Sequence, residues 1–74
     1  MTMRAPIEIY NHNGWIVTSQ GRGAFYVLRH GSRSVFFQGG DALEFESETM
    51  DESGFWRDDC ELYFDAYADV MQED

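Results

Sequence analysis

Two short turns, each flanked by apolar segments, constrain the fold of this chain most. The alternating segment Ile7 to Tyr10 precedes Asn13-Gly14, and the β-branched and aromatic segment Trp15 to Thr18 follows it. Asparagine and glycine tolerate the positive φ angles that a tight two-residue hairpin turn requires. The sequence therefore predicts a β-hairpin in this region.

A second hairpin is predicted around Gly31-Ser32, after a loop at Gln20 to Gly23. A two-residue turn there aligns the flanking segments in three pairs: Leu28 with Val35, Tyr26 with Phe37, and Val27 with Phe36. The first two pairs share one face and the third lies on the other, so both faces are partly apolar. We expect the C-terminal half to cover one face, while the other is either a candidate contact surface or is shielded by the aliphatic part of the Arg29 side chain.

The pattern changes after Gly39-Gly40. Residues 42 to 50 are rich in helix formers, and Asp41 with Glu44 three residues later fits a capping box. The same residues also alternate between apolar and acidic side chains, as a strand would. The glutamate content and the cap favour helix.

A helical period extends from Trp56 to Met71 and predicts one amphipathic helix. Its apolar residues fall within an arc of about 120° at 100° per residue: Trp56, Cys60, Tyr63, Phe64, Tyr67, Val70 and Met71. Its acidic residues fall on the opposite side: Asp58, Glu61, Asp65, Asp69 and Glu73. The first face is expected to pack on the sheet, and the second to face solvent or a partner.

These elements predict a single α+β domain over residues 1–74. Residues 1–40 form an antiparallel sheet of three or four strands, built from β-hairpins. Residues 41–74 form an acidic helical part, with one or two C-terminal helices packed on one face of the sheet.

Charge divides the chain in the same way. Thirteen of the fourteen acidic residues lie in residues 41–74, where Arg57 is the only basic residue, and the formal net charge is −9. Such a field repels nucleic acid and anionic membranes and attracts basic protein surfaces. We therefore predict a partner-binding role for exposed residues of the helical part: Asp58, Glu61, Leu62, Asp65, Asp69, Glu44 and Glu48.

Sequence motifs for catalysis, metals or cofactors are not found. Cys60 is the only cysteine and falls on the apolar helical face, so a buried thiol is expected. His12 and His30 flank the two turns, and no Cys/His spacing matches a zinc site. The glycine pairs lack the spacing of phosphate-binding loops. We expect a non-enzymatic protein without metal or cofactor and, because no signal peptide or spanning segment is evident, a cytoplasmic one.

A short, strongly acidic chain with a small antiparallel sheet, an acidic helical end and no catalytic motif resembles the small phage-encoded anti-CRISPR proteins and other DNA mimics. The resemblance covers the whole chain in type and rests on no specific motif. It implies an inhibitor, in the host cell cytoplasm, that occupies the basic DNA-binding groove or PAM-reading patch of a CRISPR effector. The arginines of the sheet half depart from the fully acidic mimics and leave open a contact made by the sheet. An alternative is an assembly protein that forms a homo-oligomer, such as a homodimer, through its aromatic sheet face.

Overall fold

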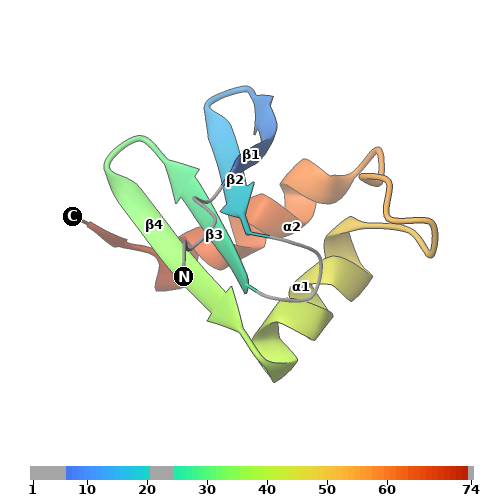
Figure 1. The fold of residues 1–74 in the computed structure, drawn as a ribbon. Coiled ribbons are helices and arrows are strands. Elements are labelled where there is room, and N and C mark those ends of the chain that lie inside the picture. Colours follow the sequence, from blue (N-terminus) through green and yellow to red (C-terminus); the bar gives the residue numbers. More distant parts are fainter. Residues whose placement is uncertain (1–6, 21–24, 74) are drawn as a thin grey trace.

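A computed structural model of the protein describes residues 7–20 and 25–73. Its elements follow in the order β1 (Ile7–His12), β2 (Trp15–Ser19), β3 (Phe25–His30), β4 (Arg33–Gln38), α1 (Gly40–Thr49), α2 (Cys60–Tyr67), the 3₁₀ turn η1 (Ala68–Val70) and β5 (Gln72–Glu73). The strands form one antiparallel sheet in chain order (Figure 1). The predicted α+β class is confirmed, with a short fifth strand added.

Both predicted hairpins are present. Asn13 and Gly14 adopt φ angles of 54° and 82°, the two positive values that the first turn needs. The second hairpin has the predicted register: Tyr26 with Phe37, Leu28 with Val35, and Val27 with Phe36. The loop predicted at Gln20 to Gly23 falls, beyond its first residue, outside the described ranges.

The helix favoured by the sequence over residues 42 to 50 is present and ends at Thr49. The predicted cap at its start is wrong. The N-cap residue of α1 is Gly39, with φ of 60° and no side-chain capping bond. Asp41 lies inside the first turn, where its charge complements the positive end of the helix dipole without capping it.

The single helix predicted from Trp56 to Met71 is wrong at both ends, and long-range contacts explain why. Trp56 pairs with Met50 in an isolated bridge, and its indole N–H donates to the Ile9 carbonyl of β1 at 3.2 Å. Asp58 and Asp59 form a turn, so α2 begins only at Cys60.

At the other end, the Arg33 guanidinium of β4 donates to the carbonyls of Ala68 at 2.6 Å and Met71 at 3.3 Å. The chain leaves the helix there, and β5 returns to pair with the start of β4. Val70, predicted on the packed face, is therefore 60% exposed.

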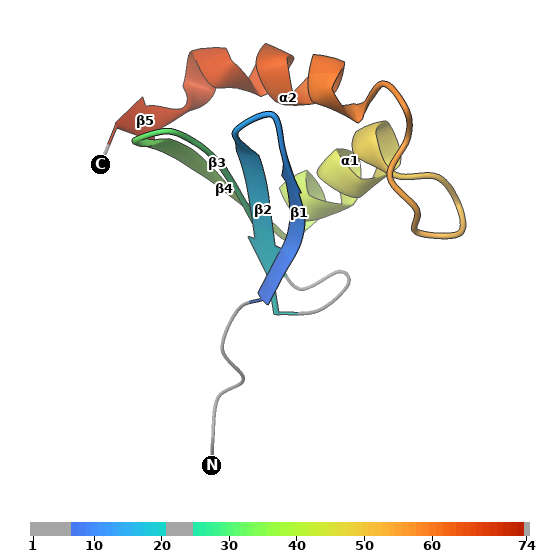
Figure 2. The ribbon, with the colours of Figure 1, turned by 90° about the horizontal axis from the view of Figure 1, so that it is seen from above.

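The core lies between the sheet and the two helices, which cover the same face of the curved sheet (Figure 2). Of the apolar arc predicted from Trp56 to Met71, Cys60, Phe64 and Met71 are buried as expected. No helix within residues 7–20 and 25–73 is long and apolar enough to span a membrane.

Candidate acidic interaction surface

Most of the predicted partner-binding residues are exposed on the two helices and the turns beside them. Glu44 lies on α1, Leu62 and Asp65 on α2, Asp58 in the turn before α2, and Asp69 in η1. Leu62 is 72% exposed. Glu48 and Glu61 are partly covered, and each contacts other parts of the protein. The set therefore divides into smaller groups with different surroundings.

One group surrounds Tyr67 at the junction of the two helices. Burial and the neighbouring carboxylate of Glu48 raise the pKa of Tyr67 to about 12. Glu44 and Asp41 act on it in the same direction. Asp41 was not among the predicted contact residues, although its spacing of three and seven residues from Glu44 and Glu48 already puts all three on one side of a helix. We call Asp41, Glu44 and Glu48 the α1 acidic group.

A second group lies at the start of α2, around a hollow of about 800 Å³ beside the first hairpin. The hollow is lined by four of the predicted residues, Asp58, Glu61, Leu62 and Asp65. His12, Asn13, Arg57 and Asp59 also line it, and the sequence analysis assigned none of them to a binding surface. Asp69 lies farther along, about one turn beyond Asp65.

Glu61 is held by the first hairpin. Its Oε1 accepts a hydrogen bond from Asn13 Nδ2 at 2.9 Å, and its Oε2 accepts one from the Tyr10 hydroxyl and lies 2.8 Å from His12 Nδ1. These contacts, led by the bond from Asn13, lower the pKa of Glu61 to about 2. Glu61 therefore links α2 to the first hairpin, and less of its carboxylate is free for a partner than the helical pattern indicated.

The low pKa of Glu61 predicts a stability change in acid. The ordinary value is 4.5 and the folded value about 2, so the stabilisation is complete above pH 4.5 and is lost as the pH falls towards 2. Glu61→Gln should melt lower than the parent at pH 7 and approach it in this window. Thermal melts of Glu61→Gln and the parent, followed by circular dichroism at pH 7 and across this window, would measure the difference. Glu52→Gln, at an exposed turn, is the control and should track the parent; identical pH profiles for the parent and Glu61→Gln would contradict the assignment.

Within the described residues, arginine does not pair with the acidic residues of the helices. Arg33 donates to the carbonyls of Ala68, which begins η1, and Met71, which follows it, and Arg57 Nε donates to the Met50 carbonyl at 3.0 Å. Across residues 7–20 and 25–73, the structure gives no ion pair between an arginine and a carboxylate of α1, α2 or η1. Asp65 and Asp69 are exposed, and no described arginine neutralises their charge.

Comparisons with protein-family models, curated proteins and solved structures found no match.

Cys60 and His30, which could be chemically reactive, are packed against other side chains. Cys60 is buried as predicted, with 3% of its surface exposed. Burial raises the pKa of its thiol, which disfavours the nucleophilic thiolate. The His30 ring packs against Trp15 at a centroid distance of 4.2 Å, with the two ring planes tilted by 33°. In the described part of the chain, no group of three or more His, Cys, Asp or Glu side chains is placed to hold a metal ion.

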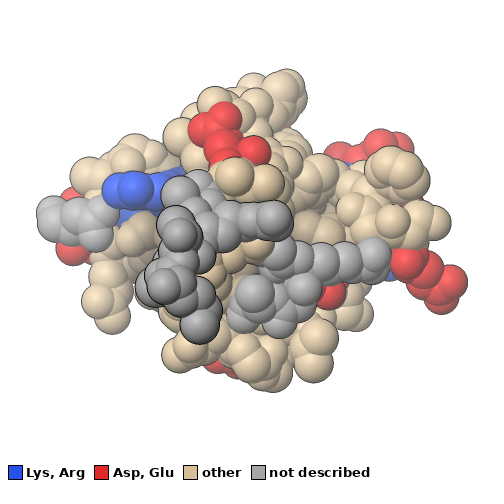
Figure 3. Space-filling model, viewed as in Figure 1, with Lys and Arg blue, Asp and Glu red and all other residues tan. Residues whose placement is uncertain are grey.

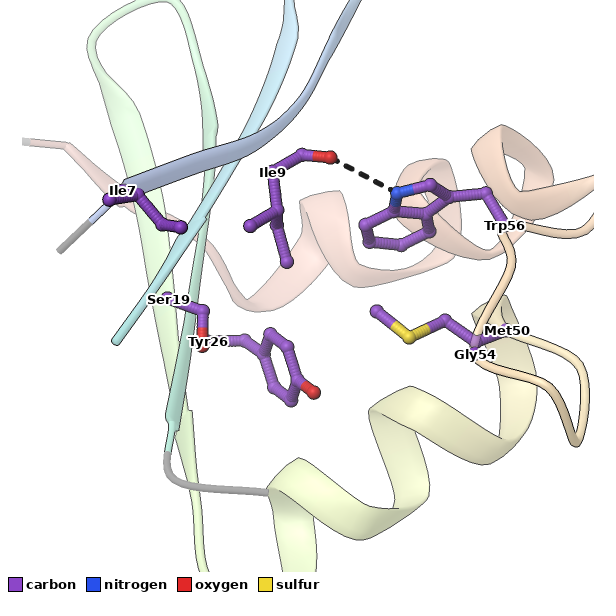
Figure 4. A pocket seen from close by; sticks show the side chains of 7 residues that line it. All are labelled: Ile7, Ile9, Ser19, Tyr26, Met50, Gly54 and Trp56. Atoms are coloured by element: carbon purple, nitrogen blue, oxygen red, sulfur yellow. Dashed lines mark hydrogen bonds between the residues drawn. The ribbon is translucent and has the colours of Figure 1, made fainter. Parts of the chain in front are cut away.

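An apolar cavity of about 370 Å³ lies between β1 and the segment that follows α1 (Figure 4). Ile7, Ile9 and Met50 supply most of its apolar lining. Among the described residues, three polar side chains line it, and each donates to a protein acceptor: Ser19 to the Phe25 carbonyl, Tyr26 to Glu46, and Trp56 to the Ile9 carbonyl. These three groups serve the fold.

Proposed function

We propose that this protein binds the basic, nucleic-acid-binding surface of another protein and inhibits it by occupancy, without catalysis. The observation that supports this most is the set of exposed carboxylates on α1, α2 and η1 that no arginine within residues 7–20 and 25–73 neutralises. Rows of arginine and lysine that hold nucleic acid are attracted to such a surface. Following the resemblance to anti-CRISPR proteins, the proposed partner is the DNA-binding groove or PAM-reading patch of a CRISPR effector complex.

The arrangement of α2 and η1 fits this role. Asp65 lies on α2 and Asp69 lies four residues later in η1, about one helical turn farther along, so each can meet one of two neighbouring basic side chains. Leu62 is exposed on the same side. An apolar side chain beside charged ones can serve as the anchor of a protein interface.

The charge pattern has a cost for the free protein. Neither α1 nor α2 has a basic residue in its last turn, where cations would be favoured. Asp65 and Asp69 have like charges at a spacing where opposite charges contribute about 0.2–0.5 kcal/mol. A surface that served stability alone would mix the two signs, so the pattern favours a contact with a basic partner.

A displacement assay tests the proposal. Labelled target DNA is bound to each of a panel of purified CRISPR effector complexes, and the protein is titrated in. We expect it to release the DNA from at least one effector. We also expect its direct affinity for that effector, measured by calorimetry, to fall as added salt shortens the Debye length. DNA that stays bound to every effector in the presence of excess protein would contradict the proposal.

A second candidate function, assembly of a homo-oligomer, is favoured by the sheet face opposite the helices. Phe25 and Phe36 stack on this face at a centroid distance of 5.3 Å, and Phe36 is 52% exposed. Most described atoms visible on it belong to neither acidic nor basic residues (Figure 3). Sedimentation at low salt and at about 1 M salt separates the two candidates, because an apolar dimer persists at high salt whereas charge-driven binding weakens.

A further inference from the structure

The two edges of the sheet are protected very differently. At the β1 edge, the Trp56 indole caps the Ile9 carbonyl, and the register shifts between Glu8 and Tyr10. Bulges and side-chain caps of this kind keep an edge strand from pairing with other chains. At the β4 edge, β5 pairs only with Arg33 and Ser34 (Figure 1).

Beyond Ser34, no described segment of the chain pairs with the β4 edge. The two-residue turn makes Leu28–Val35 and Tyr26–Phe37 the hydrogen-bonded pairs with β3, because such pairs alternate along an antiparallel ladder. Phe36, between them, therefore directs its N–H and C=O away from β3. No segment in the described ranges pairs with Phe36 at this edge.

Two adjoining hollows lie beside this edge. One, of about 490 Å³, is lined by Val27, Phe36 and Val70 together with Ser34, Val35, Gln72 and Glu73. The other, of about 260 Å³, shares Val35, Phe36 and Val70 with the first and adds Phe37, Tyr67, Asp41 and Glu44. Because side chains alternate along a strand, a strand laid along β4 would direct every second side chain towards the face of Val27 and Phe36 and the others towards the face of Phe37, Asp41 and Glu44.

We propose that the free edge of β4 binds an extended, basic segment of a partner protein as an additional strand, with apolar and basic side chains alternating. The N–H and C=O of Phe36 supply the pairing, Val27, Phe36 and Val70 receive the apolar side chains, and Asp41 and Glu44 receive the basic ones. The inference does not rest on the function proposed above, because the pairing is made by the main chain of β4 and needs neither a CRISPR effector nor Asp65 and Asp69, although Asp41 and Glu44 belong to the exposed carboxylates of both proposals.

Charge distinguishes a foreign segment from a second copy of this chain. Pairing β4 with β4 of another copy would bring two sets of Asp41, Glu44 and Glu73 together, on molecules that each have a net charge of −9. Like charges opposed across an interface suppress association. A basic strand meets the opposite charge at the same positions.

The probe for the test is a synthetic peptide of about seven residues that alternates arginine and valine, with blocked ends. A peptide with proline in place of valine has the same charge but cannot extend the sheet, and serves as the control. Phe36→Pro and Phe36→Ala both remove the phenyl ring. Phe36→Pro also removes the outward backbone N–H, whereas Phe36→Ala keeps that N–H. We expect Phe36→Pro to bind the probe about tenfold more weakly than Phe36→Ala does, and the control peptide to bind weakly to all variants.

Amide hydrogen exchange on the unmodified protein provides a second measurement. The Phe36 amide should exchange rapidly in the free protein and slowly with the probe bound. Equal binding by Phe36→Pro and Phe36→Ala would overturn the pairing. Slow exchange of this amide in the free monomer would show that the chain itself occupies the edge, and dimerisation that Phe36→Pro abolishes would identify a second copy as the occupant; either result would overturn the proposal.

Discussion

Phe45→Ala is expected to leave the protein largely unfolded at room temperature, so that no cooperative melting transition remains. Phe45 is 0% exposed and lies at the centre of the core. Its ring has five aromatic neighbours at centroid distances from 4.6 to 6.3 Å: Tyr26, Phe37, Trp56, Phe64 and Tyr67. Truncating a buried phenylalanine costs about 3–5 kcal/mol, which is as much as a domain of this size is expected to have in total. Thermal melts followed by near-UV and far-UV circular dichroism would measure the loss.

Phe55→Ala is the matched control, because the same substitution is made where the ring is 71% exposed. It should shift the free energy of unfolding by no more than about 0.5 kcal/mol. A Phe45→Ala protein that melts as the parent does would show that the ring does not occupy the position described.

Reversing two charges, Asp65→Arg with Asp69→Arg, is expected to weaken binding to the proposed effector by about two orders of magnitude. The substitutions place cations opposite the basic side chains that the parent would meet. Stability should not fall, because the changes relieve repulsion and put cations near the C-terminal end of α2. Calorimetric titration against the effector and thermal melts of the free protein would measure both effects.

The control is Glu8→Arg with Glu52→Arg, which changes the net charge by the same amount at two exposed sites on β1 and in the turn after α1. Binding by this control should fall far less than binding by the double reversal on α2 and η1. Equal losses would mean that the partner senses only total charge. Undiminished binding by the Asp65 and Asp69 variant would remove α2 and η1 from the interface.

The sequence predicts the hairpins well because their determinants are local. Asn13-Gly14 encodes its own turn, and the two-residue turn at Gly31-Ser32 fixes the register of β3 and β4. The ends of α2 are set differently. Trp56 donates to a carbonyl of β1 and Arg33 donates to the Ala68 carbonyl at the start of η1, contacts between residues 47 and 35 positions apart. A helical period continues through such residues and cannot reveal where distant partners end the helix.

The candidate surface could also be predicted from the sequence only in part, for the same reason. Exposure of Asp65 and Leu62 follows from the helical period, whereas Glu61 has the same outward pattern and a different environment. Its position on α2 matters only once the first hairpin is packed beside that helix, with Tyr10, His12 and Asn13 pointing at the carboxylate. Nothing in the spacing of these residues, about 50 positions apart, indicates the contact.

The chain order of the sheet has a consequence for how the protein folds. Strands β1 to β4 pair with one another in chain order, so the contacts among these four strands close short loops and can form early. The pairing of β5 with β4 and the docking of α2 on the first hairpin join residues about 40 to 50 positions apart, and both are expected to come late. Until then the face of β1 to β4 that later packs on the helices, which includes Val17 and Leu28, is apolar surface exposed to solvent. During synthesis this period lasts until the helices have left the ribosome, and it is when the nascent chain is most exposed to aggregation and to chaperones.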